Sequence, residues 1–457
     1  MLTIYFNECG RFIENKLSLE SFLPPLKDSI SHNFKVRIRN YYKWRRLSTK
    51  SSPRIIDGVI HVNEISHLRE MIPVYECLKE NYKVYFITNN LNTLSFIKSK
   101  SLPYINLYSL NSLVDNEIFY STKALRKDYV ESLESIKNFD GKEPIRKFLN
   151  RKFQIYCNQN KWYDKLIKSH SPKFVFVAND LTSEGRLFTV ICKKNNVPSF
   201  SIQHGNIYAD WISRFHIVDT FFTHGKLATN ILKKNNHFKT NIIASGSPFV
   251  YNLMSQKDLI YSASHQLRNK YSLPKSYILI ALSGHGYLTS KKNYDKCLRA
   301  INHLIDIKKS DYFVIKLHKK ENPQDYNFIS GKPNVKIVYE NSSSLNLQLS
   351  IYPWIINSTM LITGSSTSAV EAMLMNKPVI SIDFNQEYRD VDFVKNGASI
   401  NVNSNDDLIK SFDSIDELHI VKMESSNNIV KDYFGDLKKD SSKIIANHID
   451  SIYAAPR

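Results

Sequence analysis

The stretch LITGSSTSAVEAMLMNKPVISID, residues 361–383, decides the fold class. An apolar strand runs into a short loop of glycine and hydroxyl residues, a helical segment follows, and a second apolar strand ends the stretch. This order predicts a parallel βαβ unit whose loop lies at the carboxyl end of the first strand. The stretch therefore predicts an α/β protein.

The loop of this unit has the composition of an anion site. Glycine lets backbone amides approach a ligand, hydroxyl groups add donors, and the first turn of a helix offers unpaired N–H groups and the positive end of its dipole. We expect a phosphate group to bind there, and an acid one turn into the helix to reach a ribose hydroxyl. Simple N-capping by a hydroxyl residue explains the same pattern, and both interpretations can hold. The predicted site consists of Gly364, Ser365, Ser366, Thr367 and Glu371.

The same alternation begins upstream, near residue 275. We expect strands in SYILIALSG, YFVIKLH and NVKIVYE, and an amphipathic helix over residues 292–310. Two strand ends add candidate phosphate contacts. LSGHGY, residues 282–287, places Gly284 and His285 in a short glycine loop, which is not a specific motif when taken alone. VIKLHKKENP, residues 314–323, ends a strand with Lys316 and His318, although a solvated basic turn has the same composition.

An earlier series of strands and helices occupies residues 55–250. We expect strands at residues 54–62, 82–88, 173–180, 197–205, 218–225 and 241–248. The fourth strand ends in QHG, and this ending suits the ligand-binding edge of a sheet as well as a capped strand with a hydrogen-bonded histidine. The sixth ends in SGSP. The candidate residues at these two ends are Gln203, His204, Gly205, Gly246 and Ser247.

Two successive series separated by a polar stretch predict an α/β protein of two Rossmann-like, doubly wound domains facing a cleft. We expect a basic extension at residues 1–54, an N-terminal domain at 55–250 and an interdomain crossing at 251–269. A C-terminal domain follows at 270–425, and a C-terminal helix, within 426–457, packs back on the N-terminal domain.

The chain is strongly basic, with 62 Lys and Arg against 43 Asp and Glu and a formal net charge of +19. Such a balance favours polyanions: nucleic acid, anionic lipid or phosphate-bearing substrates. Residues 33–54 contain eight basic residues, no acidic one, and interleaved aromatic rings. This composition predicts binding to an anionic membrane surface, with a basic helix packed on the first domain as the alternative. We do not expect nucleic acid as a partner, because no binding module surrounds the segment.

The five cysteines are scattered, with no CxxC pair, so neither a disulfide framework nor a zinc site is expected. No apolar run reaches the ~18 residues needed to span a bilayer, and the N-terminus lacks the pattern of a signal peptide. We therefore expect a cytoplasmic protein, peripheral at the inner face of the cell membrane.

The ordered strand ends resemble those of GT-B glycosyltransferases. The similarity is strongest to the bacterial group of capsule Kdo-transferases, polysialyltransferases and CDP-glycerol glycerophosphotransferases. The resembling stretches are VPSFSIQHG, THGKL, SGSP, IKLH and TGSSTSAVEAMLMNKPVISID, and they lie within residues 172–383. The resemblance implies a GT-B-like fold and a nucleotide-sugar donor, with a glycan or lipid-linked acceptor. It implies no bound metal and no cofactor besides the cosubstrate.

The resemblance also implies roles for single residues. His318 matches the histidine of an HP element that contacts donor phosphates, although this chain reads HKKENP. Ser366 and Thr367 match a hydroxyl pair that binds donor phosphate, and Glu371 matches the acid of the following helix. His204 matches the histidine of a QHG element at the cleft.

Glycosyl transfer requires that the leaving phosphate is neutralised and that the acceptor hydroxyl loses a proton. We expect the base to be His204, His67 or Asp180, all in the N-terminal domain. Three alternatives remain open. They are transfer of a polyol phosphate from a CDP-linked donor, a sugar-nucleotide 2-epimerase on the same fold, and a nucleotide- or glycan-binding subunit without catalysis. The oligomeric state is not predicted.

Overall fold

A computed structural model describes residues 55–105, 107, 159–205, 207, 215–234, 239–286, 289–318, 321–339, 349 and 351–454. The basic extension at residues 1–54 lies outside the described residues. Among these, one compact unit holds residues 55–63, 82–107 and 159–199, and another holds residues 64–81 and those from 200 onward.

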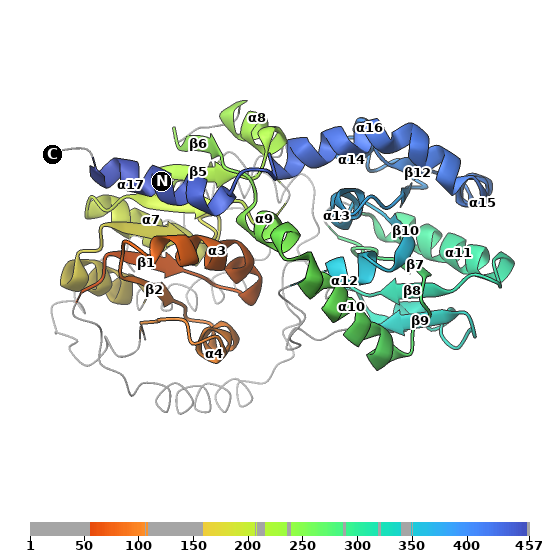
Figure 1. The fold of residues 1–457 in the computed structure, drawn as a ribbon, viewed down its shortest axis with the longest axis horizontal. Coiled ribbons are helices and arrows are strands. Elements are labelled where there is room, and N and C mark those ends of the chain that lie inside the picture. The colour runs from red at the N-terminus through yellow and green to blue at the C-terminus, as the bar shows by residue number, and fades with distance from the viewer. Residues whose placement is uncertain are drawn as a thin grey trace, which may run out of the picture. The chain divides into compact units, whose positions relative to one another are not determined.

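The first sheet has six strands in the order β2-β1-β3-β4-β5-β6 (Figure 1). β1 pairs in parallel with β2 and β3, and β5 with β4 and β6. The chain adds β2 on one side of β1 and β3 on the other, so the direction of winding reverses between β1 and β3. The strands are Gly58–His61 (β1), Val84–Ile87 (β2), Phe174–Val177 (β3), Ser199–Ile202 (β4), Thr220–Thr223 (β5) and Asn241–Ala244 (β6).

The second sheet is also six-stranded and parallel, in the order β12-β11-β10-β7-β8-β9. Its winding reverses between β7 and β10, which pair directly, with Ile280 opposite Ile362. The strands are Tyr277–Ile280 (β7), Phe313–Lys316 (β8), Val335–Val338 (β9), Ser358–Thr363 (β10), Val379–Ile382 (β11) and Ile400–Val402 (β12).

Helices connect the strands, as the parallel pairing requires. Those of the first series are α3 (Leu68–Leu78, preceded by the 3-10 turn Ile65–His67), α4 (Leu91–Ser99), α7 (Ser183–Lys194) and α8 (Lys226–Lys234). Residues 251–269 are largely helical, in α9 (Pro248–Ser255) and α10 (Lys257–Tyr271). The remaining helices are α11 (Lys291–Ile307), α12 (Tyr352–Ile355), α13 (Ser368–Leu374), α14 (Asp392–Lys395), α15 (Asn405–Asp413), α16 (Ile415–Phe434) and α17 (Ser441–Ala454).

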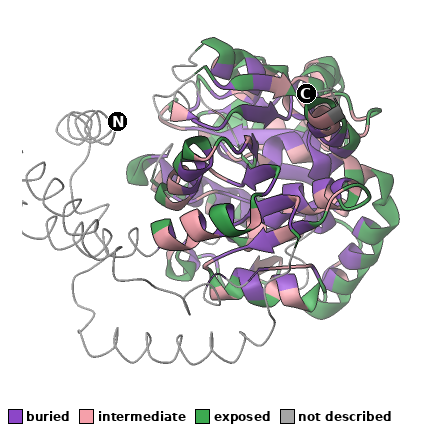
Figure 2. Ribbon diagram, turned by 90° about the vertical axis from the view of Figure 1, so that its left-hand side faces the viewer, coloured by how far each residue is buried: buried purple, intermediate pink, exposed green. Residues whose placement is uncertain are grey.

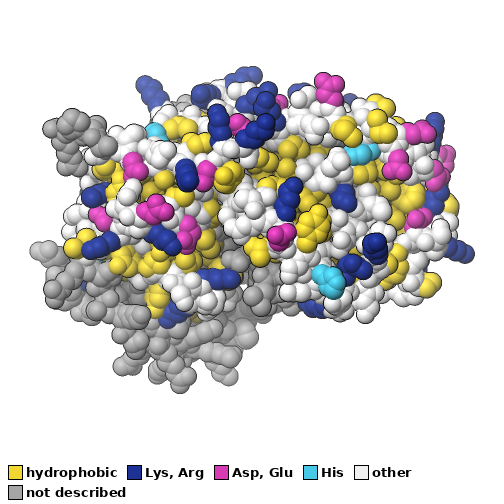
Figure 3. Space-filling model, viewed as in Figure 1, with side chains coloured by type: hydrophobic (Ala, Val, Ile, Leu, Met, Phe, Trp, Pro, Cys, Tyr) yellow, Lys and Arg dark blue, Asp and Glu magenta, His cyan; other side chains and the backbone are white. Residues whose placement is uncertain are grey.

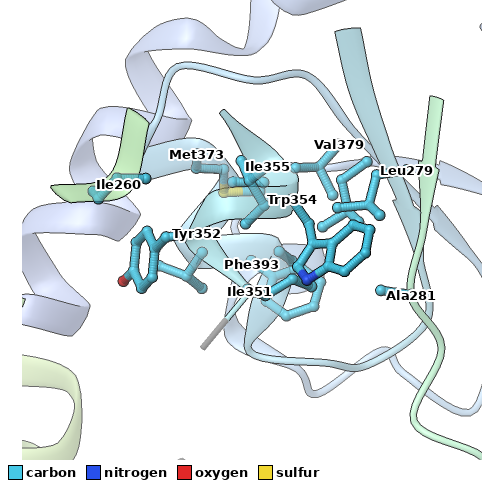
Figure 4. Close-up of a cluster of buried hydrophobic side chains, with 14 of the residues drawn as sticks. Ile260, Leu279, Ala281, Ile351, Tyr352, Trp354, Ile355, Met373, Val379 and Phe393 are labelled. Atoms are coloured by element: carbon cyan, nitrogen blue, oxygen red, sulfur yellow. The ribbon is translucent and has the colours of Figure 1, made fainter. Parts of the chain in front are cut away.

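The inner strands are buried nearly throughout, as expected for parallel sheets covered on both faces, whereas the edge strands β6 and β9 are only partly buried (Figure 2). β3 has the sequence FVFV and β7 has YILI, and each of these residues is buried. On one face of the second sheet, Trp354 from α12 is fully buried against Leu279, Val379 and Phe393 (Figure 4). α10 adds Ile260 to the same core, so this helix is part of the packing around the second sheet.

α17 packs on α3 and α9. His448 of α17 lies edge-on to the rings of Phe200 and Phe222, and the Asn81 side chain donates to Asp450 at 3.5 Å. In the described part of the chain, no helix is long and apolar enough to cross a membrane. Figure 3 shows Lys and Arg side chains gathered around α8, which contributes the exposed Lys226, Lys233 and Lys234.

Candidate functional site

The turn after β4 carries His204 and is held by its neighbour Gln203. The Gln203 side chain is buried; its Oε1 accepts from the backbone N–H of His224, and its Nε2 donates to the carbonyl of Gly205, both at 2.9 Å. One amide thus connects the turns that follow β4 and β5. Gln203 therefore supports the position of His204, which a sequence motif alone does not reveal.

His204 and His67 lie side by side, although they come from different strand ends. Their ring centroids are 4.9 Å apart with an interplanar angle of 69°. His67 is buried; His204 reaches solvent, although protein surrounds most of its ring. Desolvation by the surrounding protein, followed by the charges of His67, His224 and His216, lowers the pKa of His204 to about 3. An imidazole in this environment is neutral at physiological pH, although so low a pKa also makes it a weak base.

Beneath this pair, Glu70 of α3 is the centre of a buried network. Its carboxylate accepts from the Ser247 hydroxyl at 2.9 Å and from the Phe249 N–H at 3.1 Å, and lies 3.2 Å from His224 Nε2. Burial alone raises the pKa of Glu70, but the charge of His224 and the hydrogen bonds outweigh it and leave the pKa lowered. Glu70 is therefore a carboxylate whose acceptor positions are already engaged by protein donors.

Of the other candidates of the first sheet, Asp180, Gly246 and Ser247 are buried, whereas Gly205 is exposed. Asp180 is fully buried in the turn after β3. Ser247 is fully buried, binds Glu70 and caps α9 by accepting from the Val250 N–H at 3.2 Å. Gly246 has a φ of +86°, and a Cβ there would lie 2.3 Å from the Ser441 hydroxyl oxygen. The SGSP turn is thus explained by packing and capping, whether or not a ligand also reaches it.

At the second sheet, the two predicted loops follow neighbouring strands. The loop with Gly284 follows β7, the loop with Gly364 follows β10, and these strands pair at the point where the winding reverses. In open α/β sheets, ligands bind at the carboxyl ends of strands at this point. Ser366 Oγ accepts from the Ser368 N–H at 3.3 Å, while the Thr367 hydroxyl makes no capping bond. The topology therefore brings the predicted phosphate loops together.

A side chain at Gly364 would crowd Tyr388. A Cβ at this position would lie 3.1 Å from the hydroxyl oxygen of Tyr388, which in turn is 2.6 Å from the Thr289 hydroxyl. The Gly364 carbonyl accepts from the Ser381 hydroxyl at 3.1 Å. The backbone of the β10 loop is thus held from two sides. Ser365 is buried, whereas Ser366 and Thr367 are partly exposed.

Glu371 lies near two basic side chains. Desolvation raises the pKa of Glu371, and the charges of Arg69 and Lys316 oppose the shift. Lys316 ends β8, which lies on the other side of β7 from β10, the strand that precedes the helix of Glu371. Arg69 also lies over the Phe249 ring, 5.1 Å from its centroid. Glu371 is therefore a carboxyl group beside two cations, with a pKa raised by desolvation.

The loop that carries His318 is held by Glu321. The buried carboxylate accepts from the His318 N–H at 2.6 Å and from the hydroxyls of Tyr326 and Tyr294 at 2.6 and 3.0 Å. Desolvation raises the pKa of Glu321, although these hydrogen bonds lower it. His285, which is exposed, lies with its ring centroid 5.7 Å from that of Tyr294. This chain reads HKKENP where the resembling enzymes have HP, and the glutamate of that stretch, Glu321, holds the His318 backbone in place.

Sequence reasoning missed Glu70, His224, Glu321 and Arg69. A signal existed for Glu70, because Glu70, Val74 and Leu78 share one buried helical face and an acid on such a face needs partners. His224 stands in the quoted THGKL stretch, but its partner Glu70 lies 154 positions earlier in the sequence. Among the described residues, no three His, Cys, Asp or Glu side chains form a group suited to a metal ion.

No family model and no curated protein matches the chain. Solved structures do. The S. aureus MnaA–UDP co-structure matches with a TM-score of 0.57 and 15% identity, covering 87% of this chain and 97% of that one. The UDP-GlcNAc 2-epimerase from Neisseria meningitidis bound to UDP-GlcNAc matches with 0.56 and 16%, covering 86% and 100%. A glycosyltransferase from Rickettsia africae ESF-5 matches with 0.53 and 13%, covering 88% and 100%. The predicted α/β, GT-B-like fold of two Rossmann-like domains is confirmed.

Proposed function

We propose that this chain is a glycosyltransferase that moves a sugar from a nucleotide-activated donor to a growing bacterial surface glycan of the capsule, O-antigen or teichoic-acid type. The observation that carries the proposal is His204, an exposed, neutral imidazole at the carboxyl end of β4, in ring contact with His67. The similar folds named above include structures with UDP and UDP-GlcNAc and one glycosyltransferase, which supports a nucleotide-sugar donor.

In the proposed reaction, the acceptor hydroxyl oxygen bonds to the anomeric carbon of the donor sugar. The bond from that carbon to the phosphate oxygen breaks, and the nucleotide leaves with the electron pair. The acceptor proton passes to an imidazole nitrogen of His204, while His67 contacts the ring and the buried Gln203 amide holds the turn that carries it. His67 and Asp180 are the alternative bases, and the burial of both makes them less accessible than His204.

The leaving phosphate is neutralised by protein groups at the second sheet. Lys316 and His318 supply positive charge or N–H donors, and the loops after β7 and β10 supply amides and hydroxyls. We propose that no metal ion takes part, so transfer is expected to persist in excess EDTA. Loss of transfer in EDTA, with recovery on adding Mg²⁺ or Mn²⁺, would contradict this part of the proposal.

The test of the whole proposal separates donor binding from turnover. A thermal-shift screen over UDP, GDP, CMP and CDP identifies the nucleotide, and transfer is then measured with the matching sugar donor. His204→Asn is expected to leave melting temperature and donor affinity unchanged and to lower turnover ~10²-fold or more. Ser366→Ala combined with Thr367→Ala is expected to weaken donor binding instead. Normal turnover by folded His204→Asn protein would show that His204 is structural.

A 2-epimerase is the second candidate, since two of the compared structures bind UDP or UDP-GlcNAc and one is named as that enzyme. Epimerisation at C2 requires an acid–base pair beside the sugar ring. Glu70, the buried carboxylate next to the histidines, is already engaged by Ser247, Phe249 and His224, which disfavours this role. Incubation with UDP-GlcNAc alone distinguishes the two, because only an epimerase produces UDP-ManNAc, visible by NMR, without an acceptor.

A further inference from the structure

A second polar cluster lies at the carboxyl ends of strands β1 and β3 of the first sheet, within the unit that contains these two strands. It is formed by Asn63, two residues after β1, by Thr182 and Glu184 at the start of α7, and by Gln159. The turns after β1 and β3 flank the point where the winding of this sheet reverses. Ligands of open α/β sheets bind at that point. The reaction described above uses none of these four residues.

The Glu184 carboxylate holds two amides in fixed orientation. Oε1 accepts from Gln159 Nε2 at 2.9 Å, and Oε2 accepts from Asn63 Nδ2 at 3.0 Å. An ionised carboxylate only accepts hydrogen bonds, so both amides must turn their NH₂ groups toward it. The two amide oxygens therefore point away from Glu184, because the negative charge of the carboxylate attracts the NH₂ groups and repels the oxygens.

Among the described residues, both amide oxygens lack a hydrogen-bond partner. Asn63 Oδ1 and Gln159 Oε1 are buried acceptors with none, and Gln159 is 2% exposed. The oxygen of an amide lies roughly 2.2 Å from its nitrogen, so both unpaired acceptors flank the carboxylate. Glu184 itself is partly exposed. Native proteins rarely leave buried acceptors unpaired, so a donor from outside the described residues is expected at this cluster.

The chemistry of the cluster selects the class of ligand. A cation is disfavoured, because two N–H groups already occupy the carboxylate and would repel a metal. A phosphate is disfavoured as well, because it would face a carboxylate and two carbonyl oxygens. Hydroxyl groups on adjacent carbons fit, since each donates one hydrogen bond and accepts another. Planar amide and carboxylate groups at fixed angles can receive two such hydroxyls together.

We propose that Asn63, Gln159 and Glu184 bind adjacent hydroxyl groups of the acceptor sugar. The inference rests on the proposed function in assigning the sugar to the acceptor. The site lies on the first sheet, whereas the predicted phosphate loops follow strands of the second. Thr182 supports the cluster, because its hydroxyl caps α7, accepting from the Gly185 N–H at 3.2 Å, and lies 3.4 Å from Asn63 Nδ2.

The experiment measures binding of methyl glycosides of glucose, galactose and N-acetylglucosamine to the full chain by saturation-transfer NMR. Gln159→Met keeps the length of the side chain and removes the amide, while Glu184→Gln removes the charge that orients it. Each is expected to weaken glycoside binding at least tenfold, with melting temperature and nucleotide binding unchanged. The matched control is Glu76→Gln, which removes an exposed carboxylate paired with Lys79 on α3.

Glycoside binding at wild-type strength by folded Gln159→Met and Glu184→Gln proteins overturns the inference, and so does the absence of binding by the wild-type chain. A lower melting temperature with unchanged glycoside binding assigns the cluster to stability alone and also overturns it. Because the measurement needs no donor and no turnover, it is independent of the transfer assay. Glycoside binding that depends on Gln159 in a chain without transfer activity would refute the proposed function and leave the sugar site standing.

Discussion

His204 stays neutral because of the side chains around it. Desolvation disfavours the imidazolium, and the rings of His67, His216 and His224 add further positive potential. Glu70 acts in the opposite direction but is already paired with His224. A histidine with an ordinary pKa is partly protonated near pH 6.5, whereas His204 is not. His204 should therefore become protonated, and lose its role as the proposed base, only at a pH well below 6.5.

We expect kcat/KM for transfer to show no acidic limb near pH 6.5. The pKa of His204 is lowered to about 3, so its neutral form persists as the pH falls and is lost only on approaching that value. His67→Asn removes one cause of the lowering, so it should raise the pKa of His204 and move the limb upward. The measurement is kcat/KM between pH 4.5 and pH 8, with melting temperature followed in parallel.

His303→Asn is the control for this profile, because His303 is an exposed histidine on α11 and should leave the limb where it is. A wild-type limb centred near pH 6.5 would show that His204 titrates normally or that another histidine is the base.

A site residue could be predicted from the sequence when its motif is local, and not when its hydrogen-bond partners lie far away in the chain. Strand-end motifs name His204, Ser366 and Thr367, because glycine, hydroxyl and histidine at a strand end are visible locally. Glu321 appears in the sequence only as part of a charged run, HKKENP, and its partner Tyr294 lies on a different element. Buried charge networks join distant positions, so their members are recognised only after the chain has folded.

At the scale of elements, three glycines allow two turns of the first sheet to approach the end of α16. A Cβ on Gly225 would lie 2.2 Å from the Asp432 carbonyl oxygen, and one on Gly435 would lie 2.6 Å from that of His224 and 3.0 Å from the Cα of Gly246. Gly435 has φ +83° and ψ −163°, a conformation reserved for glycine. The segment between α16 and α17 is thus in backbone contact with the turn that carries His224.

Gly435→Ala is expected to reduce the free energy of unfolding by about 3 kcal/mol or more, because backbone strain and overpacking add. Gly331→Ala separates the two causes. Gly331 also has a positive φ, +87°, but a Cβ there meets nothing within 4 Å, so only the backbone term of roughly 1–2 kcal/mol remains. Denaturant unfolding followed by tryptophan fluorescence measures both. Equal losses for the two variants would show that the close contact with His224 has no energetic weight.

Most elements could be predicted because buried parallel strands read as short apolar runs between glycine and polar residues. Each strand from β1 to β11 falls in a range expected from this pattern. β12 has only three residues, INV, the middle one exposed, and was not predicted. α13 begins at Ser368, so the first hydroxyls of its loop precede the helix. The expected domain boundaries stay predictions.

At the scale of the whole molecule, we expect the excess of positive charge to attract the protein to anionic membrane surfaces. Residues 33–54 are expected to bind anionic membrane surfaces, with each nearby basic side chain contributing ~1 kcal/mol. Replacing Arg37, Arg39, Arg45 and Arg46 by Glu should abolish sedimentation with phosphatidylserine vesicles and leave melting temperature unchanged. Sedimentation is measured at several salt concentrations, because an electrostatic attraction must weaken as salt rises.

A charge-matched control reverses four exposed lysines elsewhere, Lys233, Lys234, Lys292 and Lys309. It changes the net charge by the same amount and should retain most vesicle binding. Equal loss in both variants would mean that the membrane responds to total charge rather than to residues 33–54, and unchanged binding in the first variant would favour a basic helix packed on the protein.

The contact between α17 and α3 has a consequence for biosynthesis. α3 leaves the ribosome early and presents Leu68, Met71, Val74 and Leu78, which are buried in the finished protein. One covering element, α17, is translated far later; the paired Asn81 and Asp450 are 369 positions apart. During elongation this apolar face is therefore incompletely covered, and such faces attract chaperones or neighbouring nascent chains. Slowed translation near the 3′ end of the message should lengthen that exposure and lower the soluble yield.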